Sequence, residues 1–428
     1  MRIAAVAALV AIGGGLSIGA LAQERVLAGA EAYGDWSRDA PGVWHKITPA
    51  DLPPPNQTES ARNASRPGAG SDTKQPKVPP GFSVSAFAQG FEMPRQMKIA
   101  PNGDIFLADS GADEIRILRA APGSAKAASN DLFAKVPSRP YGIAFYPPGP
   151  NPEYVYVATM ERLVRFPYRV GDTKARGVSQ TIIADLPSGG HWTRDVIVAP
   201  DGQHLFLAIG SSSNIQDNGE SAERWRADIV ECSPLGSGRR IFAAGLRNPV
   251  TLALNPLNGA LWTSVNERDL LGDNLPPDYV THVEDGKFYG WPYFYIGNHR
   301  DARVRGTPPV PGEQVAIPDV LIQPHSAPLG IAFYTGTQFP ADYRNDLFVA
   351  VHGSWNRVSR TGYKLIRVKF KDGRATGEYQ DFMTGFVTGD GQVWGRPVGV
   401  AMAQDGALLM SDDGAHTIWR IAYSGAGR

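Results

Sequence analysis

The amino-acid sequence predicts an all-β protein, a six-bladed β-propeller. One unit recurs six times: an apolar run, a turn that in most units contains Asn-Gly or Asp-Gly, and a second apolar run. A third apolar run follows in most units, so each unit is a β-meander. No helical periodicity competes with this pattern. About 350 residues over six units is somewhat more than the ~40–45 residues of a minimal four-stranded blade, which predicts long loops on some blades.

Composition narrows the class of protein. The 428 residues include 42 Lys+Arg and 42 Asp+Glu, and 42% are hydrophobic, which suffices for a packed core. The zero formal charge gives no reason to expect a nucleic acid or an anionic membrane as partner. Cys232 is the one cysteine, which excludes a disulfide, a cysteine-based zinc site and a haem-attachment motif within this chain.

The first 78 residues precede the repeats. Residues 1–22 combine a basic start, an apolar run and the small-x-small sequence Ala20-Leu21-Ala22, as in a secretory signal peptide. No later segment is apolar enough to span a bilayer, so we expect a soluble, exported protein, and the lack of disulfides favours a bacterial periplasm. Residues 23–78 are predicted to form an extended arm or linker.

Residues 79–428 form the predicted propeller. The first run and its leading loop begin at residues 94, 139, 194, 247, 327 and 396. The second runs cover residues 105–108, 155–158, 205–208, 261–264, 347–350 and 408–411. In a propeller the first strand of each blade lines the central channel, and the loop entering that strand opens at one mouth of the channel. Polar residues in these loops are therefore candidates for a functional site.

Arginine occupies the same register in five of the six units: Arg95, Arg139, Arg194, Arg247 and Arg396. Two interpretations are open. The arginines either form salt bridges between blades or surround a polyanionic ligand on the axis, because clustered guanidinium groups repel one another unless an anion lies between them.

Two further groups of residues are predicted at this mouth. His191 lies three residues before Arg194, where it either accepts a proton from a substrate hydroxyl or only caps a turn. His325 and His352 lie near the same mouth, and residues 352–357 form an unusual polar insertion. Residues 266–274, which include Glu267, Arg268, Asp269 and Asp273, form either a Ca²⁺ site or a solvated loop.

Four motifs in blade register carry a resemblance to a known family: Gly189-Gly190-His191, residues 245–249, residues 288–292 and Trp394-Gly395-Arg396. From about residue 79 to 421 the chain resembles the soluble glucose/sorbosone dehydrogenases that use pyrroloquinoline quinone (PQQ), and residues 352–357 are most similar to the sorbosone-type branch. PQQ is a planar tricarboxylate, which would explain a ring of arginines.

The resemblance implies a role for each candidate residue. His191 would be the general base, while hydride passes to the quinone. Arg247 and Asn248 would lie beside the quinone oxygen, and Arg194 and Arg396 would bind the cofactor. Ca²⁺ would lie around Glu267 and Arg268, held mainly by backbone carbonyls, with Asp269 and Asp273 nearby. A sugar or a sugar-derived aldehyde or alcohol would be oxidised, and electrons would leave to a separate acceptor such as a periplasmic cytochrome.

The sequence departs from the family pattern at three places. The aspartate beside the histidine base is replaced by residues 211–214, so Asp195, Asn214 or Asp217 is expected to orient the base. The cofactor-binding lysine is missing, and His352 or Arg357 is expected to replace it. Trp394 stands where one of two arginines is expected.

These departures leave the sugar open. A calcium-dependent propeller lactonase and a non-catalytic sugar-binding propeller are the alternative functions. A nicotinamide site is not expected, because no Gly-x-Gly-x-x-Gly follows a strand in a βαβ unit.

Overall fold

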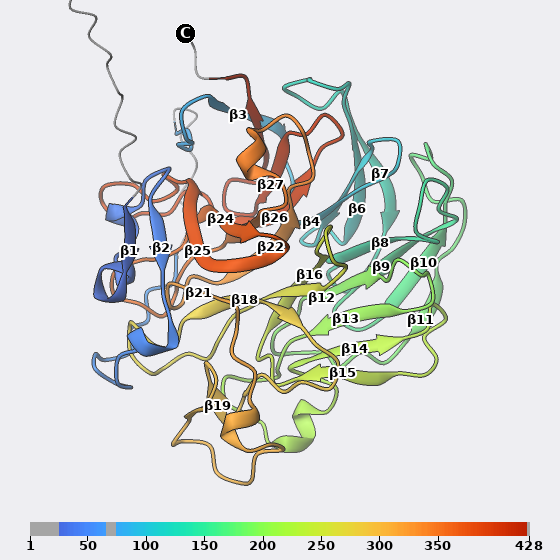
Figure 1. The fold of residues 1–428 in the computed structure, drawn as a ribbon. Helices are drawn as coiled ribbons and strands as arrows, with labels where there is room; N and C mark the ends of the chain where they lie inside the picture. The colour runs from blue at the N-terminus through green and yellow to red at the C-terminus, as the bar shows by residue number, and fades with distance from the viewer. Residues whose placement is uncertain (1–24, 66–73, 426–428) are drawn as a thin grey trace, which may run out of the picture.

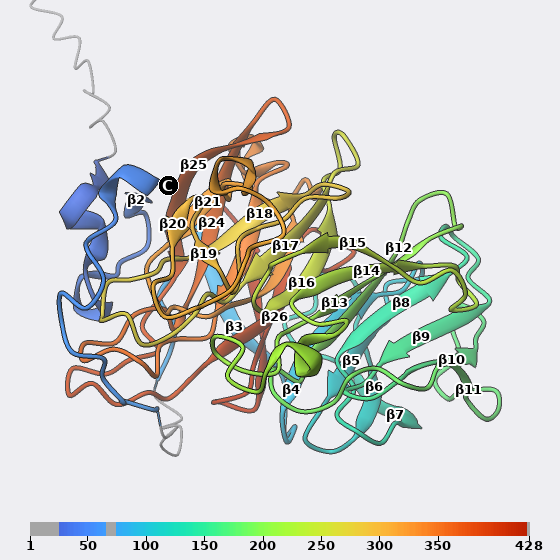
Figure 2. The same cartoon turned by 90° about the horizontal axis from the view of Figure 1, so that it is seen from below.

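The computed structural model describes residues 25–65 and 74–425. Within them the chain forms strands and six short 3-10 helices, and no α-helix. Six antiparallel sheets surround one axis as the blades of a propeller, as predicted (Figures 1 and 2). The predicted signal peptide at residues 1–22 lies outside the described residues. In the described part of the chain, no helix is long and apolar enough to cross a membrane.

The blades follow the predicted repeats in order, and each begins with its innermost strand. Blade 1 contains β4 (Pro94–Ile99), β5 (Ile105–Asp109), β6 (Glu114–Arg119) and β7 (Ser129–Lys135). Blade 2 contains β8 (Gly142–Tyr146), β9 (Tyr154–Ala158), β10 (Leu163–Pro167) and β11 (Gln180–Ile183). Blade 3 contains β12 (Arg194–Val198), β13 (Leu205–Ile209), β14 (Asp228–Cys232) and β15 (Arg240–Ala244).

Blades 4 to 6 complete the ring, and blade 4 contains an inserted hairpin. Blade 4 contains β16 (Pro249–Leu254), β17 (Leu261–Val265), β18 (Asp278–Val283) and β21 (Val320–Ile322), with the inserted hairpin β19 (Phe294–Tyr295) and β20 (His299–Arg300). Blade 5 contains β22 (Pro328–Phe333), β23 (Leu347–Val351), β24 (Lys364–Lys371) and β25 (Arg374–Met383). Blade 6 contains β26 (Pro397–Met402), β27 (Leu408–Asp412) and β28 (Thr417–Tyr423).

The ring is closed by a strand from the beginning of the propeller. β3 (Phe82–Gln89) pairs antiparallel with β28 and is the outer strand of blade 6. The two ends of the repeat region therefore share one sheet, which removes the open edge that blade 6 would otherwise present.

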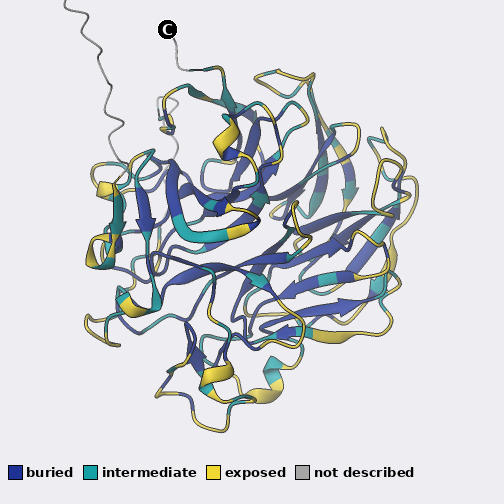
Figure 3. Ribbon diagram, viewed as in Figure 1, coloured by how far each residue is buried: buried dark blue, intermediate teal, exposed yellow. Residues whose placement is uncertain are grey.

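The turns within the blades have the chemistry that the repeats predict. In blade 3, Gly202 has φ +68° and its N–H donates to the carbonyl of Ala199 at 2.9 Å. The Asp201 carboxylate accepts the N–H of Gln203 at 2.8 Å. Glycine reaches this left-handed conformation without a steric penalty, so the Asp-Gly pair reverses the chain between β12 and β13. The second strands of the blades are almost wholly buried between their neighbours, and exposure is concentrated in loops (Figure 3).

The N-terminal arm is more ordered than a linker. β1 (Val26–Ala28) pairs with β2 (Trp44–Lys46), and β2 pairs antiparallel with β25, so blade 5 becomes a six-stranded sheet. The 3-10 helices η1 (Gly29–Tyr33), η2 (Trp36–Arg38) and η3 (Pro49–Asp51) belong to this arm. The others are η4 (Glu220–Glu223), η5 (Gly312–Gln314) and η6 (Ala341–Tyr343).

An apolar cluster divides the central channel. Tyr141, Val250, Leu329 and Val398 come from four blades and pack together, with Trp192 against them. Tyr141 directly precedes β8, and the other three are the second residues of β16, β22 and β26. The Tyr141 hydroxyl is 3.1 Å from that of Thr251. One cavity lies at the entry side of this plug and another at its far side.

Candidate functional site

The candidate site is a cavity of about 380 Å³ at the mouth where the innermost strands begin. It lies over blades 3 to 5 and reaches Arg95 of blade 1. The candidate residues His191, Arg247, Asn248, Glu267, Asp269 and His352 all line it, as do His325 and Trp355. The side chain of Trp355 is 46% exposed. Loops more than 150 residues apart in the sequence therefore converge on one cavity, as the repeat register predicts.

Ser211 orients His191. The ring Nδ1 lies 3.0 Å from the Ser211 carbonyl oxygen and 2.9 Å from its hydroxyl oxygen. A carbonyl oxygen only accepts, so Nδ1 carries the proton and Nε2 carries the lone pair. The Ser211 hydroxyl donates in turn to the carbonyl of Ser213 at 2.7 Å. The expected orienting residues Asp195, Asn214 and Asp217 are not the partners of this ring.

The imidazole is neutral over a wide pH range. Burial, and then the neighbouring Arg247 guanidinium, lower the pKa of His191 to about 3. In the free protein the ring therefore titrates well below the ordinary imidazole pKa of about 6.5. The ring is held as a neutral acceptor, with Nε2 available to a hydroxyl proton.

Glycine lets two candidate residues meet. A Cβ atom on Gly210 would lie 2.2 Å from Asn248 Oδ1 and 2.6 Å from His191 Cβ. Any larger residue would push His191 and Asn248 apart. Gly210 is the residue that follows β13, so the repeat places it below the loop that carries His191.

Arg247 is fully engaged by the protein. Nε donates to the Asn214 carbonyl at 3.1 Å, and NH1 donates to the carbonyls of Asn266 at 3.2 Å and Glu267 at 2.7 Å. NH2 donates to Asn214 Oδ1 at 3.0 Å and Asp269 Oδ2 at 3.1 Å. All five N–H donors are used. Arg247 therefore acts on the cavity through its charge, because none of its N–H donors is left free for a ligand.

The predicted ring of arginines is only partly formed. Arg95 NH1 donates to Asp413 at 2.6 Å, and Arg396 Nε lies 2.9 Å from the same carboxylate. His352 Nε2 is 3.0 Å from Asp413 as well. Asp413 of blade 6 therefore pairs with arginines of blades 1 and 6, so for Arg95 and Arg396 the structure shows the salt-bridge interpretation.

Two members of the ring face elsewhere. Arg194 is fully buried and donates to the carbonyls of His191, Thr193 and Pro187, so it shapes the loop that carries His191. Arg139 is exposed and lies over the Trp192 ring, with its guanidinium carbon 5.5 Å from the ring centroid. Arg194 thus does not line the cavity as the prediction of a cofactor ligand required.

The predicted calcium segment, residues 266–274, also has some residues at the cavity and others elsewhere. Glu267 and Asp269 line the cavity, whereas Arg268 is buried in an ion pair with Asp301 and donates to the Asp269 carbonyl at 2.8 Å. Asp273 faces the arm, where its N–H donates to the Thr58 hydroxyl at 2.8 Å. The expectation that Arg268 and Asp273 belong to a metal site at this cavity is not met by their positions.

Arg357 also binds the arm. It donates to the carbonyls of Tyr33 at 2.8 Å and Gly34 at 3.0 Å, and to Asn274 Oδ1 at 2.8 Å. Of the two residues expected to replace the missing lysine, His352 lines the cavity and Arg357 does not. Trp394 is buried and donates to the Gly385 carbonyl at 2.8 Å, so it stabilises a loop.

The carboxyl groups of the cavity differ in charge. Burial would raise the pKa of Asp269, but hydrogen bonding to His325 and the charge of Arg247 lower it to about 2. Burial raises the pKa of Glu267 to about 7, against the opposing charge of Arg247. Burial also raises the pKa of Asp278 to about 6. Asp269 is therefore a permanent anion, and Glu267 is poised to lose its proton near neutrality.

Three buried polar atoms at the cavity have no hydrogen-bond partner among the described residues. They are the donor Arg95 Nε and the acceptors Asn248 Oδ1 and Glu267 Oε2. Unpaired buried polar atoms are costly, and at a site they mark places where a ligand is expected to bind. The cavity presents a free donor on one side and free acceptors on the other, which suits an anion and a cation bound together.

Sequence reasoning missed three residues of the site: Asp413, Asp278 and Ser211 in its orienting role. Asp413 follows the second strand of blade 6, in the register that Asn266 occupies in blade 4. This shared position in the repeat could have identified Asp413 from the sequence. Asp278 opens β18 and accepts the N–H groups of Glu267 at 2.8 Å and Ala327 at 2.7 Å, so it ties two cavity loops together.

The fold and the site define a class: a six-bladed β-propeller with a polar cavity at the entry mouth of its axis, built around a neutral histidine. The family model described as TrAA12-like matches residues 76–285 and 312–424. The chain belongs to this family.

The chain is also similar to individual proteins. The chain is 29% identical to an uncharacterized protein of Borreliella burgdorferi, with 81% of this chain and 90% of the relative aligned. It is 24% identical to a pyrroloquinoline quinone-dependent pyranose dehydrogenase of Coprinopsis cinerea, over 72% of this chain and 47% of that protein, so it spans about half of that relative. The calcium structure of a Trichoderma reesei carbohydrate-active enzyme of family AA12 superposes with a TM-score of 0.71 at 18% identity, covering 83% of this chain and 99% of that one.

Proposed function

We propose that this protein is a PQQ-dependent dehydrogenase that oxidises a sugar or a sugar-derived aldehyde or alcohol, with His191 as general base. The observation that carries the proposal is the meeting, in one cavity, of a neutral imidazole acceptor with unpaired donor and acceptor atoms. The Coprinopsis relative, whose name gives both the quinone and a pyranose substrate, supports the same reaction class.

His191 performs the proton transfer in this proposal. Nδ1 is fixed on Ser211, so Nε2 points its lone pair at the hydroxyl of a bound substrate and accepts its proton as the carbon loses hydride. The Arg247 cation, held in place by five hydrogen bonds, stabilises negative charge that develops on the oxygen. Because Arg247 is already positioned, no reorganisation is needed as that charge appears.

The unpaired atoms fit the proposed cofactors. Arg95 Nε would donate to a carboxylate of PQQ, with Arg396 and His352 beside it, and Asn248 Oδ1 and Glu267 Oε2 would face Ca²⁺, which prefers oxygen ligands. When bound, PQQ would supply the two-electron acceptor and Ca²⁺ a positive charge next to it. The calcium structure of the Trichoderma enzyme makes that ion a reasonable choice. In this assignment side chains, rather than the backbone carbonyls around Arg268, face the metal.

We further propose a periplasmic location and a separate electron acceptor such as a cytochrome. The signal-like sequence of residues 1–22 supports export. The substrate would then be a sugar of aldose or sorbosone type that is oxidised in the periplasm.

The decisive experiment is reconstitution of the apoprotein. PQQ and Ca²⁺ should bind stoichiometrically, change the quinone absorbance and produce sugar-dependent reduction of an artificial dye. Omitting either cofactor should abolish dye reduction. Full activity with NAD and no quinone, or hydrolysis of lactones by the metal-loaded protein alone, would overturn the proposal. A panel of aldoses, sorbosone and simple aldehydes then ranks the substrates by kcat/KM.

A further inference from the structure

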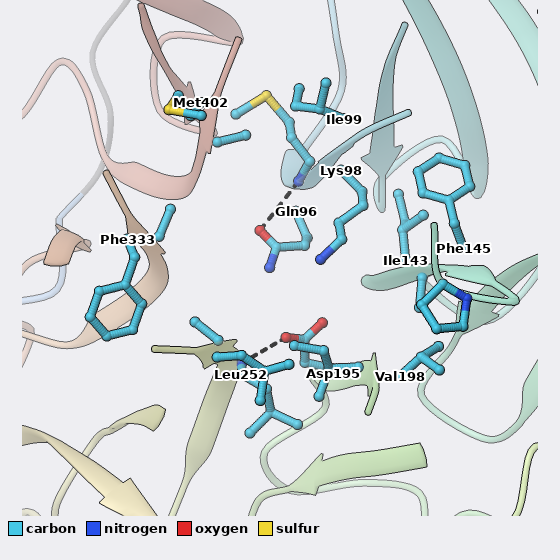
Figure 4. Close-up of a pocket in the computed structure, with 18 of the residues that line it drawn as sticks. Gln96, Lys98, Ile99, Ile143, Phe145, Asp195, Val198, Leu252, Phe333 and Met402 are labelled. Carbon is cyan, nitrogen blue, oxygen red and sulfur yellow. Dashed lines mark hydrogen bonds between the residues drawn. The ribbon is translucent and has the colours of Figure 1, made fainter. Parts of the chain in front are cut away.

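The far half of the central channel is a second cavity, of about 630 Å³, lined by residues of all six innermost strands. Its walls are mainly apolar, with Ile99, Phe145, Phe333 and Met402 around it (Figure 4). It lies beyond the apolar plug, so none of the residues that line the candidate site also line this chamber. It is therefore a separate compartment, of a size that holds small molecules in other proteins.

Three polar side chains point into this apolar space: Gln96, Lys98 and Asp195 (Figure 4). The Asp195 carboxylate accepts the N–H of Leu252 at 2.8 Å. The Gln96 amide oxygen accepts the N–H of Met97 at 3.2 Å. Neither group is a cation, since Gln96 is neutral and Asp195 is acidic, so attraction of an anion falls to Lys98.

Lys98 differs from its neighbours. Among the described residues its ammonium makes no hydrogen bond, and no carboxylate lies within the 4.0 Å of an ion pair. Burial lowers the pKa of Lys98, and the more distant charge of Asp195 only opposes that shift. Lys98 is only partly buried, and its ammonium faces a mainly apolar chamber without a protein partner, so an anionic ligand would gain a charge-assisted bond there.

We propose that this chamber binds an amphiphilic monocarboxylate, with its carboxylate on Lys98 and its apolar body against the channel walls. A hydrocarbon chain or an aryl ring suits the apolar walls, and a single carboxylate matches the single free ammonium. A sugar does not fit, because the walls offer few free hydrogen-bonding groups. The site is independent of the proposed oxidation.

The test uses octanoate and 1-octanol as probes that differ only in the charged group. Calorimetric titration of the full-length protein at pH 7.5 should give octanoate at least tenfold tighter than octanol, since one charge-assisted bond separates them. Lys98→Met keeps the length and removes the charge, so octanoate should lose its advantage while octanol binds as before. Lys371→Met, the same change at an exposed turn of blade 5, should leave both affinities unaltered.

Three outcomes would overturn the proposal. The first is equal binding of the two probes to the unmodified protein, which would make the chamber merely apolar. The second is a preference for octanoate that survives in Lys98→Met. The third is a preference lost in Arg95→Met instead, which would place the anion in the candidate site. Thermal unfolding of each variant without probe checks that the fold is intact, and Lys98→Met should be at least as stable as the unmodified protein.

Discussion

Replacing His191 by alanine tests the core of the proposed chemistry. The side chain contacts the protein through Nδ1 and Ser211, whereas the unpaired atoms assigned to the cofactors belong to other residues. We therefore expect the alanine variant to fold and to bind PQQ and Ca²⁺ normally. Reduction of the bound quinone by substrate should slow by about 10²–10⁴-fold, the usual effect of losing a positioned general base.

The measurement is stopped-flow reduction of the quinone in purified, cofactor-loaded variant. Ser211→Ala is the matched control: it removes the hydroxyl contact at 2.9 Å but keeps the carbonyl contact at 3.0 Å, so its rate should fall less. A His191→Ala rate near that of the unmodified enzyme would refute the reasoning. Normal chemistry combined with lost PQQ affinity would show that His191 only shapes the loop.

The lowered pKa of His191 also predicts how the stability of the apoprotein depends on pH. In the apoprotein the pKa of His191 is lowered to about 3 by burial and by Arg247. Between about pH 3 and 6.5 the unfolded chain therefore binds a proton at this ring and the folded protein does not. Its contribution to stability is present above the unfolded pKa of about 6.5 and is lost as pH falls toward 3. Chemical-shift titration of the His191 ring should show no protonation between pH 5 and 8; a midpoint near 6.5 would contradict the buried, cation-flanked site.

Four further predictions concern the charges around the cavity. Asp413→Asn should destabilise the protein by about 3–5 kcal/mol in thermal unfolding, because it leaves the Arg95 and Arg396 charges without their shared carboxylate, and PQQ should restore part of the loss. Arg396→Ala should weaken PQQ about ten- to a hundredfold in an absorbance titration, whereas Arg357→Ala should lower stability with PQQ affinity unchanged, because Arg357 binds the arm. Burial raises the pKa of Glu267 to about 7 from its ordinary 4.5, so stability should fall as pH rises between these values, and Glu267→Gln should remove that slope. Ca²⁺ should raise the unfolding temperature more at pH 8 than at pH 5, because the Glu267 carboxyl must lose its proton to bind the ion; equal effects at both pH values would exclude it as a ligand.

The sequence alone determined the six blades and the mouth at which the site lies. Apolar runs and Asp-Gly turns are local signals, and their spacing along the chain shows which loop leads into each innermost strand. His191, Arg247 and Asn248 lie in such loops. It did not reveal that blade 6 takes β3 as its outer strand, nor that β1 and β2 extend blade 5. These pairings join segments more than 300 residues apart and leave little local trace.

The contacts of each candidate side chain follow from the folded structure and could not be predicted from the repeats. The arginines were predicted to share one register, but the strand pairing shows otherwise. Arg194 is itself the first paired residue of its blade, opposite Ile209, whereas Arg247 lies two residues before Pro249 and Arg396 one residue before Pro397, the first paired residues of theirs. Arg194 donates to loop carbonyls, Arg247 has all five donors engaged and Arg396 meets Asp413. A one- or two-residue offset in the entry loop changes where the arginine Cα lies, and the long side chain then reaches any of several partners, so the repeat pattern does not place the guanidinium. Burial, which a sequence reveals only on average, likewise made His191 a neutral base, and the arrangement of the innermost strands left the Lys98 ammonium without a partner among the described residues.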